Sequence, residues 1–384
     1  MKKKNQKLQY LIKKKYKYQL LENGFSDQDI SIGKKVLNSK RITMASYTRN
    51  FELAFAKKLG AKYALMVNSG SSANLLATFA AGNPLKKNCL KRGDEVLIPA
   101  LCWSTSIWPL VQFGLKPIFV DIDIETLNIN LEDLEKKITK KTKAICVVHV
   151  GGVISGKIID LLKMCKKKKL FLIEDAAHAH GSYLNKKLHA GTIGDIGCFS
   201  FYPTKVMTTG EGGMITTNNK KLYNKMSSYK NFGRGPNPNV INFLGANYKI
   251  SEFTAILGIL ELERIKKRIN KRKAIVMRYL HNLKDNNKFN VIVQNQGRSS
   301  YYKCIIKTKI KSKIIQKYCK INGIELTGKV WDTPIHQQKI FKKYSKNQNF
   351  INAEKFSEYH ICPPNYPELT FNDIDYVCTV LNKI

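Results

Sequence analysis

Short apolar segments alternate with segments of helical periodicity along the first two thirds of the chain. The apolar segments are rich in Val, Ile and Phe on both faces, a pattern typical of central strands in a mainly parallel sheet. The stretches between them have the spacing and composition of helices. This alternation predicts an α/β fold, in which helices cover both faces of a seven-stranded sheet to make three layers. The predicted strands span residues 63–67, 95–99, 117–122, 144–150, 170–174, 196–202 and 213–216, and helices are expected at 71–81 and 131–138 among others.

The pattern changes after residue 250. One helical segment is predicted at 251–283, and shorter strand-like pieces such as 301–306 follow it. A smaller C-terminal α+β domain is therefore expected beside the large sheet domain. The predicted division is an N-terminal arm and helix at 1–40, the large domain at 41–250, and the small domain at 251–384, which includes the long helix as a bridge.

Composition narrows the class of protein. A chain of 384 residues with 43% hydrophobic residues can bury a large core in two domains. No apolar run approaches the roughly 20 residues that a membrane helix needs. Nine cysteines without a paired C-x-x-C spacing suggest neither a disulfide framework nor a zinc site, so we expect no metal and a reducing cytoplasm.

The formal net charge of +38 could indicate nucleic acid, an anionic membrane or acidic ligands as partners. Lysine outnumbers arginine and occurs in nearly every block of ten residues, whereas nucleic-acid binders more often concentrate charge on one element beside stacking aromatic side chains. This distribution disfavours a nucleic-acid partner. Attraction of anionic substrates such as nucleotide diphosphates is the expected consequence.

Four segments carry candidate chemistry, and each follows a predicted strand. Since ligands bind at the carboxyl ends of parallel strands, the four should meet at one site. The first, residues 68–74 (Asn-Ser-Gly-Ser-Ser-Ala-Asn), opens a helix with Gly70 and Ser71, where exposed backbone N–H groups suit a phosphate. Taken alone, this segment is better explained as an ordinary helix cap without a ligand.

The second segment, residues 173–178 (Ile-Glu-Asp-Ala-Ala-His), ends an apolar run with two acids. The carboxylate of Asp175 could hold a metal, bind a ribose hydroxyl, pair with a protonated ring nitrogen, or simply cap a helix.

The third segment, residues 198–205, ends in Lys205 and precedes a glycine-rich stretch; its apolar setting favours the free amine that attacks aldehydes. The fourth contains Trp103, a possible platform for a flat heteroaromatic ring, although a core position is the simpler explanation.

The order of these segments resembles the DegT/DnrJ family of nucleotide-sugar aminotransferases, which are fold type I pyridoxal-phosphate enzymes of the aspartate-aminotransferase type. The resemblance covers most of the chain. It rests on the phosphate loop, the aromatic residue, Asp-Ala-Ala-His, Ser-Phe-x-x-x-Lys with Thr-Gly-Glu-Gly-Gly, residues 245–252 (Gly-Ala-Asn-Tyr-Lys-Ile-Ser-Glu) and residues 334–337 (Pro-Ile-His-Gln).

The resemblance implies pyridoxal 5′-phosphate as the cofactor of the large domain. Lys205 would hold it as a Schiff base and Asp175 would bind its pyridine nitrogen. The other residues to which the resemblance gives a role are Gly70, Ser71 and Ser200 at the phosphate, Trp103 on the ring, His178 near the ring hydroxyl, Asn247 or Lys249 reaching the phosphate from the partner in a homodimer, and Glu211 and His336 toward the substrate.

By the same resemblance the reaction is a ping-pong transfer of the amino group of glutamate to a keto group of a nucleotide-linked sugar, in amino-sugar or cell-surface glycan biosynthesis. A sugar 3-dehydratase of the same family is the alternative, and residues 68–74 with the insert 82–94 resemble that branch. Its known members have histidine where this chain has Lys205, which favours the aminotransferase. A non-catalytic regulator that binds nucleic acid is the remaining alternative.

Overall fold

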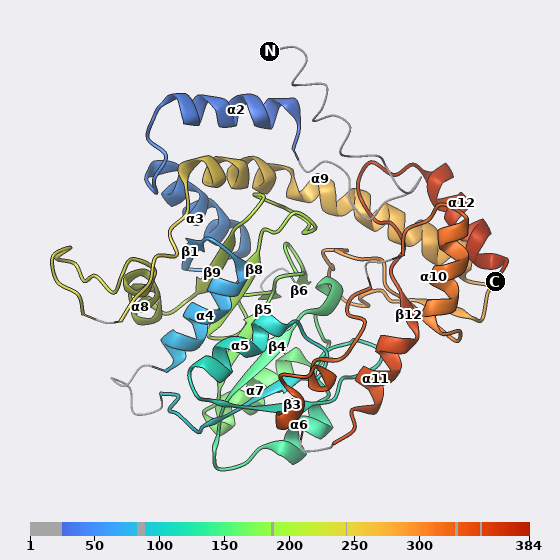
Figure 1. The fold of residues 1–384 in the computed structure, drawn as a ribbon, viewed down its shortest axis with the longest axis horizontal. Coiled ribbons are helices and arrows are strands. Elements are labelled where there is room, and N and C mark those ends of the chain that lie inside the picture. Colours follow the sequence, from blue (N-terminus) through green and yellow to red (C-terminus); the bar gives the residue numbers. More distant parts are fainter. Residues whose placement is uncertain (1–24, 83–88, 186–187, 243, 327–328, 346–347) are drawn as a thin grey trace.

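The computed structural model describes residues 25–82, 89–185, 188–242, 244–326, 329–345 and 348–384 (Figure 1). Seven strands form one sheet in the order β1-β9-β8-β5-β4-β2-β3. All pairs are parallel except those of β9, which runs antiparallel to both β1 and β8. All seven predicted strands are confirmed: β1 (Tyr63–Val67), β2 (Glu95–Pro99), β3 (Lys116–Val120), β4 (Thr142–Val148), β5 (Phe171–Asp175), β8 (Ile196–Ser200) and β9 (Gly213–Thr217).

Helices cover both faces of this sheet, so the three-layer prediction is confirmed. Successive strand residues alternate between two apolar cores: Leu65 and Val67 face one core, and Ala64 and Met66 face the other. One layer holds α4 (Gly70–Ala81), α5 (Ser104–Gln112) and α8 (Lys220–Lys230); the opposite layer holds α3 (Ser46–Leu59), α6 (Leu131–Lys137), α7 (Ile158–Lys168) and part of α9 (Glu252–Leu283).

The C-terminal part of the chain forms its own small antiparallel sheet in the order β10-β11-β12. Its packing partner is α9, which runs from the large sheet toward α12 (Figure 1). The further elements are α2 (Asp27–Asn38), β6 (Tyr183–Asn185), β7 (Leu188–His189), β10 (Phe289–Val291), β11 (Ile306–Thr308), α10 (Ser312–Ile321), α11 (Ile351–Glu358), β12 (His360–Ile361) and α12 (Phe371–Asn382).

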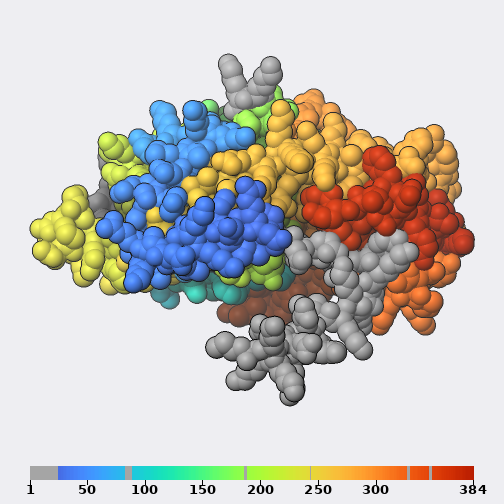
Figure 2. Space-filling model, turned by 90° about the horizontal axis from the view of Figure 1, so that it is seen from above, coloured from blue at the N-terminus to red at the C-terminus, as the bar shows by residue number. Residues whose placement is uncertain are grey.

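The domain boundaries at residues 40 and 250 remain a prediction, and the arm before residue 25 lies outside the described residues. Helix α2 packs along α9, and Figure 2 shows it in blue over the body of the molecule. Asp29 accepts from Nη1 of Arg264 at 2.7 Å across that contact. None of the described helices has the length and apolar character that crossing a bilayer would require.

The strand predicted at 301–306 is wrong, because only its last residue, Ile306, belongs to a strand. Tyr301 has a φ of 51°, which breaks an extended conformation. The carbonyl groups of Tyr301 and Tyr302 accept from the side chains of Asn365 and Arg272 instead of from a neighbouring strand. Long-range side-chain contacts therefore decide the backbone here.

The start of α9 also fixes the start of α3. Ser251 caps α9, and the carboxylate of Glu252 crosses to α3, which lacks a side-chain cap of its own. This carboxylate accepts from the backbone N–H groups of Ala45, Tyr47 and Thr48 at 2.7, 2.7 and 2.9 Å and from the Thr48 hydroxyl at 2.7 Å. One buried side chain thus joins two helices that are some 200 residues apart in sequence.

We expect Glu252→Gln to lower the free energy of unfolding by about 2 kcal/mol at pH 7, because an amide places a donor against backbone donors. Burial alone raises the pKa of Glu252, but the bonds from Thr48, Ala45 and Tyr47 lower it below its ordinary value of 4.5. The carboxylate therefore stabilises fully above that value and progressively less as the pH falls through the folded-state pKa.

Urea unfolding of wild type and variant between about pH 7 and pH 3 checks this expectation, and the difference should shrink toward the acid end. A difference that stays constant across this range would contradict the role of the charge.

Candidate active site

A cavity of about 520 Å³ opens at the carboxyl ends of β1, β5 and β8, where the polar segments of the sequence converge. Residues from the C-terminal part of the chain close its other side. Of the predicted site residues, the cavity brings together Gly70, Ser71, Trp103, Asp175, His178, Ser200, Lys205 and Glu211. The remaining lining residues are Ser69, Asn74, Thr105, Val148, Ala177, Tyr202, Thr204, Tyr302, Lys303, Lys329, Val330 and Trp331.

The floor of the cavity includes the first turn of α4. Ser69 caps this helix, and its side chain accepts from the N–H of Ser72 at 3.1 Å. A Cβ atom added at Gly70 would lie 2.6 Å from Cβ of Ser200, so only glycine allows the helix to start this close to β8. The backbone N–H groups of the first turn lack helical partners, which makes this turn suitable for an anionic group such as phosphate.

Asp175 ends β5 and is 5% exposed. Its Oδ2 accepts from the Ser106 hydroxyl at 2.6 Å and from Nδ2 of Asn74 at 3.2 Å, and its Oδ1 accepts from the N–H of Ala177 at 3.1 Å. Three hydrogen-bond donors thus surround a carboxyl group that also reaches the cavity. An acid in this setting can hold a protonated ring nitrogen.

Lys205 lies in a turn directly after β8, where its N–H donates to the carbonyl of Tyr202 at 2.9 Å. The side chain enters the cavity, and its Nζ atom lies 4.8 Å from the ring centroid of Tyr302. The amine is therefore inside the site and faces the aromatic ring of Tyr302, from the C-terminal part of the chain.

His178 forms an aromatic stack at the cavity wall. Its ring lies 4.4 Å from that of Tyr302 and 5.7 Å from that of Trp331, centroid to centroid. Burial, and then the positive charge of Lys205, hold the pKa of His178 well below its ordinary value of 6.5. Nδ1 accepts from the N–H of Gly151 at 3.3 Å, so the neutral ring carries its proton on Nε2 and can donate from there.

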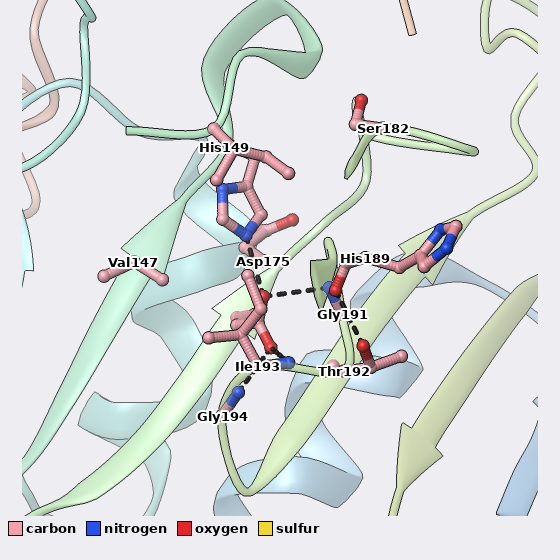
Figure 3. A network of polar contacts seen from close by, with 12 residues as sticks. Val147, His149, Asp175, Ser182, His189, Gly191, Thr192, Ile193 and Gly194 are labelled. Atoms are coloured by element: carbon pink, nitrogen blue, oxygen red, sulfur yellow. Dashed lines mark hydrogen bonds and ion pairs between the residues drawn. The ribbon is translucent and has the colours of Figure 1, made fainter. Parts of the chain in front are cut away.

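The other acid at the end of β5, Glu174, has a structural role on the opposite face of the sheet. It is fully buried and accepts backbone N–H bonds from Gly191 at 2.9 Å, Ile193 at 2.7 Å and Gly194 at 2.6 Å. Nε2 of His149 lies 2.9 Å from its Oε2. Figure 3 shows these contacts converging between β4, β5 and the loop before β8.

Three predicted residues do not line the cavity of their own chain. Asn247 and Lys249 lie where the loop after α8 returns toward that helix: Asn247 forms a β-bridge with Asn231, and Nζ of Lys249 lies 4.8 Å from the ring centroid of Phe232. His336 is buried at 3% exposure, with Nε2 3.0 Å from Glu354 and its ring 4.5 Å from that of Phe350. These contacts pack His336 into the core, away from the residues that line the cavity. Its role toward substrate stays a prediction.

Sequence reasoning assigned no role to several residues that the structure brings into the site. Asn74 lay within the quoted phosphate segment, and Ser106 follows Trp103 by three positions, so proximity in sequence could have indicated both as partners of Asp175. Tyr302 had no such signal, because it comes from the small domain. Among the described residues, no group of three or more His, Cys, Asp or Glu side chains is placed to hold a metal ion.

A model of the DegT/DnrJ/EryC1/StrS aminotransferase family matches residues 26–382, and the chain belongs to this family. The GDP-4-keto-6-deoxy-D-mannose 3-dehydratase of Escherichia coli O55:H7 is 33% identical over 388 residues, which cover 95% of this chain and 99% of that protein. The GDP-perosamine synthase of Escherichia coli O157:H7 is 32% identical over 345 residues, covering 88% and 90%.

A solved structure gives the same result for the fold. An aminotransferase of Helicobacter pylori involved in the biosynthesis of pseudoaminic acid superposes with a TM-score of 0.86 and 26% identity, over 95% of this chain and 98% of that one. The fold type I architecture that the resemblance implied is thereby confirmed.

We expect Glu174→Gln to lower the free energy of unfolding by about 3 kcal/mol, because the amide puts a donor among buried donors. Glu135→Gln, an exposed carboxylate on α6, is the matched control and should change stability by less than about 0.5 kcal/mol. Urea unfolding of both variants measures the difference. Equal stability of the two variants would show that the buried carboxylate does not organise this edge of the sheet.

Proposed function

We propose that the protein is a pyridoxal-phosphate-dependent aminotransferase that moves the amino group of glutamate to a keto group of a nucleotide-linked sugar. The observation that carries this proposal is the meeting of Asp175, Lys205 and the first turn of α4 in one cavity. Both curated relatives described above are named for GDP-linked sugars, which supports GDP as the nucleotide.

The residues present fit the cofactor. The first turn of α4, with Gly70 and Ser71, and the side chain of Ser200 would hold its phosphate. Asp175, held by three donors, would accept a hydrogen bond from its protonated ring nitrogen. Neutral His178 would donate to an oxygen on the ring, and the indole of Trp103, 57% exposed at the rim, would cover a ring face.

The cofactor, when bound, supplies a protonated ring that accepts electrons as the Cα proton of the amino donor leaves. Nζ of Lys205 is the group of this chain that can take that proton from Cα of glutamate. In the second half-reaction the same Nζ returns a proton to the sugar carbon that receives nitrogen. The lining from Val330 and Trp331 shields the two transfers from water.

Overall similarity does not distinguish the dehydratase function from the aminotransferase function, because the dehydratase and the synthase are 33% and 32% identical to this chain. The side chain at position 205 separates them better. A lysine that regains its covalent bond to the cofactor after each turnover suits two half-reactions in one site, so Lys205 supports the aminotransferase.

A homodimer completes the proposed site. Asn247 and Lys249 stand outside the cavity of their own chain, on a loop with exposed apolar side chains at Ile241 (68%) and Leu244 (91%). Figures 1 and 2 both show this loop projecting from the body of the molecule. In a dimer the loop would reach the phosphate end of the partner's cavity, and its apolar side chains would be covered.

We place the enzyme in the cytoplasm, in the synthesis of amino sugars for cell-surface glycans. All nine cysteines are buried as free thiols, which suits a reducing compartment.

Wild-type protein mixed with pyridoxal phosphate should develop a visible absorption band that glutamate bleaches with release of 2-oxoglutarate. In Lys205→Ala, amino transfer should fall about a thousandfold, because the proton-transferring amine is gone. Borohydride reduction followed by peptide mass analysis should find the cofactor on Lys205. Lys220→Ala, an exposed lysine at the start of α8, is the control and should behave as wild type.

If borohydride reduction of the wild-type protein gave no lysine adduct, the assignment of Lys205 as the residue that binds the cofactor would be wrong. Removal of the sugar 3-hydroxyl in place of amino transfer would instead identify the dehydratase.

Subunit complementation tests the shared site. Lys205→Ala and Lys249→Ala should each be nearly inactive alone, whereas a mixture refolded together should regain about a quarter of wild-type activity, since random pairing leaves one intact site in each mixed dimer. Activity against mixing ratio and mass of the assembly give the measurement. No recovery, with mixed dimers present, would place Lys249 in its own subunit's site or outside any site.

A further inference from the structure

Tyr302 lies beside Nζ of Lys205, although it belongs to neither the seven-stranded sheet nor the four segments that carry candidate chemistry. Nζ of Lys205 is 4.8 Å from the centroid of its ring, and the ring of His178 is 4.4 Å away. The side chain is 7% exposed and lines the cavity. A phenol ring at this distance from an ammonium group gives a favourable cation–π contact.

The ring is fixed from several sides. Its hydroxyl lies 3.1 Å from Oγ1 of Thr204, the residue just before the reactive lysine. The N–H of Tyr302 donates to the hydroxyl of Ser300 at 3.3 Å, and its carbonyl accepts from Nη1 of Arg272 at 3.2 Å. A platform held this firmly loses little conformational freedom when a cation rests on it.

The charges around the ring identify Lys205 as its main cationic neighbour. Burial and nearby lysines keep the pKa of His178 far below neutrality, so that ring is uncharged. Lys303 also lies near the ring, with Nζ 5.7 Å from the centroid against 4.8 Å for Lys205. Arg272 contacts the backbone carbonyl of Tyr302. Burial on its own raises the pKa of Tyr302, but Lys205, Lys303 and the Thr204 contact together lower it.

We propose that Tyr302 is a positioning residue, whose ring holds the ammonium group that Lys205 becomes when its free amine has taken the Cα proton. This inference rests on the proposed function, in which Lys205 must leave and regain its bond in each half-reaction. A free lysine side chain has a flexible stem of four carbons and a strongly hydrated ammonium group. The ring keeps Nζ in the cavity through the proton transfers, while Thr204 ties the ring to the lysine turn.

Competitive labelling of full-length, cofactor-free protein tests the contact directly. A trace of isotopically labelled acetic anhydride is added across a pH series, and mass spectrometry of the peptide that contains Lys205 gives its reactivity. In Tyr302→Leu the midpoint of the labelling curve should fall by roughly half a pH unit, since the ammonium form loses its partner. Tyr302→Phe keeps the ring and should keep the wild-type midpoint.

A purely structural effect of the leucine variant has the opposite sign. A loosened cavity admits water, which favours the ammonium form and moves the midpoint upward. Tyr301→Leu is the matched control, because this neighbouring tyrosine is equally buried at 7% but does not line the cavity. It should leave the midpoint unchanged.

In the loaded enzyme, kcat for amino transfer should fall about tenfold in Tyr302→Leu, with KM for glutamate within about twofold, and Tyr302→Phe should restore most of kcat. An unchanged or raised labelling midpoint in Tyr302→Leu would overturn the proposal, as would a phenylalanine variant that behaves like the leucine variant, which would assign the effect to the hydroxyl. Because labelling needs no cofactor, its outcome stands apart from the test of the proposed function.

Discussion

Two adjacent carboxylates end β5, and the site depends on how a strand directs them. Successive side chains of a strand point to opposite faces of the sheet. Glu174 and Asp175 are neighbours in sequence, so they lie on different faces and have different surroundings. Glu174 accepts three backbone N–H bonds from residues 191–194, and these bonds join the end of β5 to the loop before β8. Its carboxylate also lies beside the ring of His149. The strand that carries Asp175 is thereby held in register with the strand that leads to Lys205.

The cavity separates its charges by position. Asp175 is enclosed by donors at the sheet edge, Lys205 faces the small domain, and His178 between sheet and small domain is kept uncharged by burial. A neutral imidazole beside a lysine can donate without repelling it, whereas an imidazolium would compete with the ammonium group for the same anionic ligands. The site thus places the carboxylate of Asp175 at the sheet edge and the amine of Lys205 opposite it, and Glu211, Lys303 and Lys329 also line the cavity.

Much of this arrangement could be predicted from the sequence because it is local. Apolar runs without a polar face specified all seven strands of the large sheet, and the residues that follow those strands must meet at one edge once the sheet is parallel. Gly70, Asp175 and Lys205 follow from that rule, and the cavity contains all three.

What escaped prediction is long-range. The strand expected at 301–306 failed because Asn365 and Arg272, distant in sequence, bind its carbonyl groups. Tyr302 enters the site through that same irregular backbone. His336 shows the converse: its motif resembles that of the family, but Glu354 and Phe350 enclose the side chain in packing that no local pattern reveals.

The similarity to both a synthase and a dehydratase has a physical explanation. Solved structures of both a dehydratase and an aminotransferase share this fold over 95% of this chain, and one fold can support different reactions. The family resemblance assigns the difference in chemistry to one side chain, which is Lys205 in this chain. Overall identity therefore measures the shared scaffold, while Lys205 and the aromatic ring beside it bear on the reaction. For this chain the groups around a single amine are better evidence of function than the alignment as a whole.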